Sequence, residues 1–172
     1  HYYQTTLQYA VEGVAASDVN LDWSKGQGYR GSVVQRMTNG VAYLFKKNKI
    51  DVVHGRAFLK DQHSLRVMKG DSAQTYTFKN LIIATGSHPI EIPGFKFNGR
   101  VIDSTGLLEL QQQPKELVII GGGYIGCELA SAYANFGTHV TILEGTDAIL
   151  RNYEKDVVKV AQTNLEKRGV TI

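Results

Sequence analysis

The sequence has very little cysteine, and its single Cys127 can form no disulfide within the chain. A secreted disulfide scaffold and a cysteine-cluster metal site are therefore excluded, and a reducing, cytoplasmic location is the default expectation. No apolar run approaches the roughly 18 residues that a membrane-spanning helix needs, so we expect no membrane segment. The first residue is His1, and the residues after it do not read as a signal peptide.

Neither sign of charge dominates, and the charged residues are scattered along the chain. The 19 Lys and Arg residues exceed the 16 Asp and Glu residues by a formal net charge of +3. They form no basic block interleaved with aromatic side chains, so we expect no nucleic-acid partner. Apolar residues make up 42% of the sequence and charged residues 20%, which is ordinary for a folded domain. A length of 172 residues suits one ordinary domain or two incomplete ones.

Both ends read as internal to a longer chain. The sequence does not begin with methionine, and residues 169–172 read as a helix stop followed by the first residues of a strand. We therefore expect a fragment.

Only three prolines occur, and they separate two halves with different patterns. In the first half, residues 3–14 and 31–48 read as helices, and the second of these carries an apolar stripe that we expect to be buried. Short segments of strand character follow, which predict a small antiparallel meander. These segments are residues 50–53, 57–59, 64–67 and 75–78. Residues 81–84 are continuously apolar, as is typical of a strand buried on both faces.

The second half alternates strictly between strand and helix. Residues 116–120 and 139–143 predict strands, residues 124–136 and 156–168 predict helices, and Val170 opens a third strand. This βαβαβ order predicts an α/β fold with a Rossmann-like, doubly wound parallel sheet and right-handed crossovers.

A glycine-rich turn joins the first of these strands to its helix. It matches the pattern G-x-G-x-x-G through Gly121, Gly122, Gly123, Tyr124, Ile125 and Gly126. In this pattern the first glycine permits a tight turn, the second leaves room for a pyrophosphate, and the third lets helix and strand pack closely. The helix N-terminus supplies N–H donors to the phosphates, so the turn predicts dinucleotide binding.

An acidic residue, Glu144, ends the second strand, where a carboxylate accepts hydrogen bonds from the adenosine ribose. A 2′-phosphate would be repelled by this charge, so NAD is favoured over NADP. The alternative is an ordinary acid at a strand end.

Two motifs in tandem resemble the pyridine nucleotide–disulfide oxidoreductases, and among them the dihydrolipoyl dehydrogenases. Residues 81–89 look like the second flavin-domain signature of that family, and residues 121–128 look like its NAD-domain signature. Residues 102–108, which lie between them, are also similar to the dihydrolipoyl dehydrogenase pattern. The resemblance implies FAD and NAD as cofactors. It implies the C-terminal part of an FAD-binding domain in residues 1–100 and the N-terminal part of an NAD-binding domain in residues 101–172.

The same resemblance implies roles for individual residues. Thr85, Gly86 and Ser87 would lie against FAD, and Gly55 and Ala57 would offer backbone groups to its adenine, although Gly55 also suits a strand end. In the second half, Glu128 would pair with a lysine beside the flavin, or be a first-turn acid that the helix dipole favours. Tyr124 would cover the nicotinamide pocket or serve packing.

The sequence also departs from the family. A first glycine-rich flavin turn, a pair of redox cysteines and a C-terminal domain are all missing, and Cys127 is better interpreted as a small buried side chain. We therefore expect no catalytic residue in this chain. The resemblance implies a homodimeric parent enzyme that oxidises dihydrolipoamide carried by an acyltransferase component. The alternatives are an NADH-dependent peroxidase, oxidase or transhydrogenase of the same family, and a non-catalytic dinucleotide-binding module.

Overall fold

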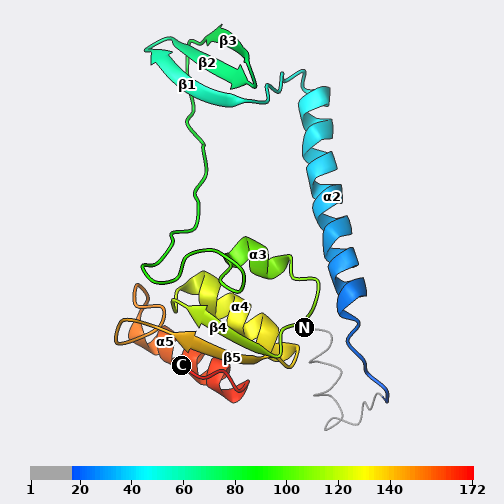
Figure 1. Cartoon of the computed structure of the whole chain (residues 1–172), viewed down its shortest axis with the longest axis vertical. Helices are drawn as coiled ribbons and strands as arrows, with labels where there is room; N and C mark the ends of the chain where they lie inside the picture. The colour runs from blue at the N-terminus through cyan, green and yellow to red at the C-terminus, as the bar shows by residue number, and fades with distance from the viewer. Residues whose placement is uncertain (1–16) are drawn as a thin grey trace. The chain divides into compact units, whose positions relative to one another are not determined.

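The computed structural model describes residues 17–172, and the helix expected over residues 3–14 lies outside them. The chain divides into two compact units. One is Tyr29–Gly94, and the other contains Phe95–Ile172 with the described residues up to Gly28. Figure 1 shows their elements. The proposed division into flavin and NAD parts stays a prediction.

A long helix, α2 (Trp23–Lys47), begins before the residues that the sequence pattern indicated. Its first turn is capped by Asp22, whose carboxylate accepts a hydrogen bond of 3.0 Å from the Lys25 amide. Gly26 and Gly28 lie near the start of this helix, although glycine has a low helix propensity. The expected buried stripe is wrong, because no residue of α2 is buried and Met37 is 64% exposed.

Three strands form the antiparallel meander that the sequence predicted (Figure 1). They are β1 (Arg56–Asp61), β2 (Ser64–Lys69) and β3 (Ser72–Thr77). The turn between β2 and β3 contains Gly70 in the left-handed region, with φ of +57°, which suits glycine.

Two predicted strands do not form. Residues 50–53 and 81–84 have no regular structure, and Ile82 is 89% exposed. An apolar run becomes a doubly buried strand only where other strands lie on both edges and helices cover both faces. Neither segment pairs with a strand in the part of the chain that the structure describes.

The second unit contains the predicted alternation of strands and helices. Two parallel strands, β4 (Glu116–Ile120) and β5 (His139–Leu143), pair in register from Glu116 with His139 to Ile120 with Leu143. Two helices follow them in the chain, α4 (Tyr124–Asn135) and α5 (Lys155–Lys167). A parallel bridge between Thr141 and Thr171 continues the sheet beyond β5. The predicted α/β fold with a parallel sheet and a separate antiparallel meander is therefore confirmed.

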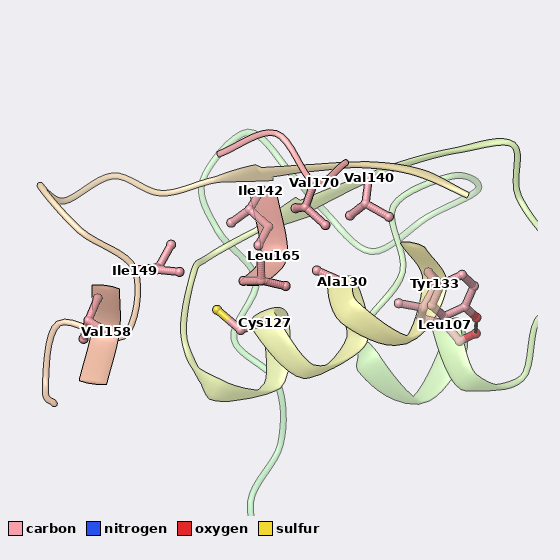
Figure 2. Packing of buried hydrophobic residues seen from close by; sticks show 10 residues of the cluster. All are labelled: Leu107, Cys127, Ala130, Tyr133, Val140, Ile142, Ile149, Val158, Leu165 and Val170. Atoms are coloured by element: carbon pink, nitrogen blue, oxygen red, sulfur yellow. Dashed lines mark hydrogen bonds between the residues drawn. The ribbon is translucent and has the colours of Figure 1, made fainter. Parts of the chain in front are cut away.

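Ten apolar residues form the core of this unit, between the inner face of the sheet and the helices (Figure 2). Ala130 of α4 and Ile142 of β5 are almost completely buried, as expected where a helix packs on a strand. A short helix that the sequence did not indicate, α3 (Ser104–Leu108), contributes Leu107. The Leu107 carbonyl accepts a hydrogen bond of 2.6 Å from the Tyr133 hydroxyl, which ties α3 to α4 (Figure 2).

Candidate nucleotide-binding site

The glycine turn connects β4 to α4 at the carboxyl end of the parallel strands. Its first residue, Gly121, has φ of +105°, a conformation that glycine adopts without strain. The Gly121 amide donates a hydrogen bond of 2.8 Å to the Leu143 carbonyl at the end of β5. The turn thus lies where open α/β sheets bind their ligands.

The other glycines of the pattern differ in what a side chain would meet. A Cβ at Gly126 would overlap the Gly121 carbonyl oxygen, and lie 3.2 Å from the Ile119 Cγ2 atom. Gly126 is therefore required for close contact between α4 and β4, as the pattern predicted. A Cβ at Gly123 would meet no atom of the protein within 4 Å, and its φ of −73° suits any residue. Neither a steric contact nor the backbone conformation requires glycine at position 123.

Gly122, a variable position of the pattern, is also sterically restricted. A Cβ there would lie 2.5 Å from the Ile149 Cγ2 atom and 3.1 Å from a Glu144 carboxylate oxygen. Its carbonyl accepts a hydrogen bond of 2.8 Å from the Leu150 amide. Leu150 itself has φ of +52°, a backbone conformation that is uncommon for a large side chain. The turn is therefore packed tightly against the segment that follows β5.

The first turn of α4 presents backbone donors beside Gly123. The Cys127 amide donates to the Gly123 carbonyl at 2.9 Å. The amides of residues 124–126 precede this bond, so helix geometry leaves them without an intrahelical acceptor. Together with the positive end of the helix dipole, these amides suit a phosphate group.

Glu144 faces this turn from the end of β5. One carboxylate oxygen, Oε2, accepts a hydrogen bond of 2.7 Å from the Gly122 amide. The other, Oε1, accepts hydrogen bonds of 2.8 Å from both the amide and the hydroxyl of Thr146. The Gly122 and Thr146 donors lower the pKa of Glu144 from its ordinary value, so the carboxylate stays ionised at neutral pH.

The glycine turn and Glu144 line one cleft of about 490 Å³. This volume lies within the range of small-molecule sites, which is about 300 to 1,000 Å³. The lining residues are Gly122, Gly123, Tyr124, Glu144, Leu150, Arg151, Asn152 and Tyr153. Sequence reasoning found the first four and missed the last four. Their position just after a parallel strand was an available signal, because ligands bind beyond the carboxyl ends of such strands.

Cys127 is a buried residue of α4, as its interpretation from the sequence proposed. Its thiol donates to the Gly122 carbonyl, with 3.4 Å between sulfur and oxygen. Burial raises the pKa of the Cys127 thiol, and the negative charge of Glu144 raises it further. The thiol is therefore a poor nucleophile and a structural contact of the turn.

The residues assigned to NAD lie together, whereas those assigned to FAD do not form one element. Ile125 and Glu128 are exposed on α4, beside the turn. Ala57 belongs to β1, and residues 85–87 lie in an exposed segment without helix or strand. A Cβ at Gly55 would lie 2.5 Å from the Val67 Cγ1 atom of β2, so packing within the meander explains this glycine. The flavin roles stay predictions.

Within residues 17–172, no group of three or more His, Cys, Asp or Glu side chains is placed to hold a metal ion. In the same residues, no helix is both long enough and apolar enough to cross a membrane.

The chain is similar to known proteins along its whole length. Residues 1–172 match the family described as pyridine nucleotide-disulphide oxidoreductase. The chain is 52% identical over 172 residues to a dihydrolipoyl dehydrogenase of Geobacillus stearothermophilus, covering 100% of this chain and 37% of that protein. It is 54% identical over 160 residues to a dihydrolipoyl dehydrogenase of Staphylococcus aureus, covering 93% of this chain and 34% of that protein. The chain thus spans little more than a third of these relatives.

Solved structures have a similar fold. A Cu(II) complex of the flavoprotein disulfide reductase RclA from Escherichia coli has a TM-score of 0.81 and 33% identity, covering 99% of this chain and 38% of that chain. LpdA from Mycobacterium tuberculosis has a TM-score of 0.86 with 21% identity, covering 98% of this chain and 38% of that one, and shows the fold alone.

Proposed function

Because the chain belongs to the pyridine nucleotide-disulphide oxidoreductase family, we propose that it is an internal segment of a dihydrolipoyl dehydrogenase and contributes the adenosine end of its NAD site. In such an enzyme, electrons pass from dihydrolipoamide through a redox disulfide and FAD to NAD+. The segment itself binds and orients the dinucleotide. The thiol chemistry belongs to residues outside it, since Cys127 is the only cysteine of the chain.

The observation that carries this proposal is the open position at Gly123. Gly121 and Gly126 are explained by backbone conformation and by packing. A side chain at Gly123 would meet nothing in the protein, and Gly123 lines the cleft that Glu144 also lines. A pyrophosphate against the first turn of α4 gives a steric reason for this glycine, which no contact within the protein gives.

The test is a titration of the chain with NADH, followed by fluorescence, in the wild type and in Gly123→Ala. A methyl group in a tightly filled contact costs about 1 to 3 kcal/mol, so we expect the Kd for NADH to rise roughly ten- to hundredfold. The matched control is Gly40→Ala in α2, where a Cβ also meets nothing within 4 Å and which lies outside the cleft. Equal NADH affinity in the Gly123 variant and the wild type would refute the proposal.

The wider assignments rest on the relatives. The similar proteins described above at 52% and 54% identity are named dihydrolipoyl dehydrogenases, which favours this activity over a peroxidase, oxidase, transhydrogenase or non-catalytic module. From the same similarity we propose that the complete enzyme binds FAD, accepts dihydrolipoamide carried by an acyltransferase component, is a homodimer and is cytoplasmic.

A further inference from the structure

Glu144 is held by two neighbours before any ligand is considered, and only one of them lines the cleft. The three hydrogen bonds that its carboxylate accepts come from the Gly122 amide and from the amide and hydroxyl of Thr146. Gly122 lines the cleft, whereas Thr146 does not. The Gly145 amide also acts on this carboxylate and is a smaller cause of the lowered pKa of Glu144.

The Gly122 donor is itself fixed in place. Its carbonyl accepts from the Leu150 amide at 2.8 Å and from the Cys127 thiol at 3.4 Å. The Ile149 side chain fills the space where a Cβ of residue 122 would lie. One end of the carboxylate is therefore attached to the packed core of the unit.

The Thr146 donor restrains the other end. Thr146 is exposed, and its hydroxyl lies 2.8 Å from Glu144 Oε1 and 3.1 Å from the Ala148 carbonyl oxygen. Without this hydroxyl, Oε1 would keep its hydrogen bond from the Thr146 amide but lose the one from the Thr146 side chain. A glutamate side chain has considerable rotamer freedom, and restraining it in advance removes part of the entropy loss on binding.

We propose that Thr146 is a positioning residue for dinucleotide binding, because its hydroxyl and the Gly122 amide hold the Glu144 carboxylate in one orientation toward the cleft. The inference rests on the proposed function, since it assumes that Glu144 accepts a ribose hydroxyl. Thr146 acts only through Glu144 and does not touch the ligand.

The experiment compares Thr146→Val and Thr146→Ser in the 172-residue chain, with Kd values for NADH and NADPH measured by fluorescence titration. Valine keeps the size of threonine and the backbone donor but lacks the hydroxyl. We expect Thr146→Val to weaken NADH binding roughly three- to tenfold, as preorganisation is lost. The Kd for NADPH should change less, because the Glu144 carboxylate repels its 2′-phosphate. The ratio of the two Kd values should therefore become smaller. Thr146→Ser should restore both values.

The matched control is Thr163→Val, which makes the same change at an exposed position of α5 outside the cleft. We expect its affinities to equal those of the wild type. A Thr146→Val chain with wild-type affinities, or a serine variant that fails to restore them, would overturn the role of Thr146. A wild-type chain with no affinity for NADH would instead overturn the proposed function. In that case, the contact between Thr146 and Glu144 can still be tested by NMR of the Gly122 amide. A changed chemical shift in Thr146→Val would show that Thr146 holds Glu144, and an unchanged chemical shift would show that it does not.

Discussion

Glu144 accepts hydrogen bonds from two segments that are far apart in the sequence, the glycine turn and the loop after β5. A binding role for Glu144 was predicted from its place at the end of the second strand. Its bond to Gly122 was not, because the variable positions of G-x-G-x-x-G carry no stated requirement. The hydrogen bonds from Thr146 were not predicted either, since they depend on the conformation of the loop after β5. The sequence thus indicated the turn and Glu144, which line the cleft, but not the hydrogen bonds that hold Glu144 in place.

At this same scale, we expect Glu144→Arg in the complete enzyme to shift cofactor preference from NAD toward NADP. The change replaces an acceptor for ribose hydroxyls with a donor for a 2′-phosphate. A hydrogen bond to a charged group contributes about 1.5 to 3 kcal/mol, so NAD binding should weaken roughly ten- to hundredfold. The measurement is kcat/KM with each cofactor. The substitution also removes the acceptor of the Gly122 amide, but this loss affects both cofactors and cancels in the ratio of their kcat/KM values. An unchanged ratio would show that Glu144 does not select the cofactor.

At the scale of elements, the local sequence pattern predicted strands correctly where they pack against other elements and wrongly where they do not. The bounds of β4 and β5 match the predicted residues, because Val140 and Ile142 are buried against α4. The equally apolar residues 81–84 remain exposed and unpaired with any described strand. The spacing of glycines alone is also insufficient to predict a nucleotide-binding turn. Residues 26–31 also read G-x-G-x-x-G, yet they lie inside α2 and form no turn.

The contact between α4 and β4 gives a prediction for Gly126→Ala. The added Cβ would overlap the backbone oxygen of Gly121, which has no flexible end to move aside. Overpacking of this kind costs about 1 to 3 kcal/mol, so we expect a lower urea midpoint. Trp23, the only tryptophan, packs against Tyr133 of α4 with its ring tilted by 48°, so its fluorescence reports this unit. Gly123→Ala meets no protein atom and changes only the N-cap residue of α4, so it should lower the midpoint less. Equal midpoints for both variants would show that Gly126 is not required for packing.

At the scale of the whole molecule, the chain covers 37% of the Geobacillus stearothermophilus relative and contains one buried cysteine. We expect the purified chain to show no lipoamide-dependent NADH turnover, because it contains no pair of cysteines to form the redox disulfide. We also expect it to be purified without flavin colour, since the first glycine-rich flavin turn is not in the sequence. Turnover in a lipoamide assay would contradict the proposal that the thiol chemistry belongs to residues outside this chain. Stoichiometric flavin absorbance would contradict the expectation that the chain alone does not retain FAD.

The central claim is that the cleft between the glycine turn and Glu144 takes the adenosine end of NAD. The most direct measurement is an NMR titration of the isotopically labelled chain with NADH and, separately, with NADPH. We expect the largest saturable shifts at the amides of Gly122, Gly123 and Tyr124, which lie around the cleft, with a lower Kd for NADH than for NADPH. Saturable shifts confined to residues outside the cleft, an equal or lower Kd for NADPH, or no saturable shift at all would contradict the claim.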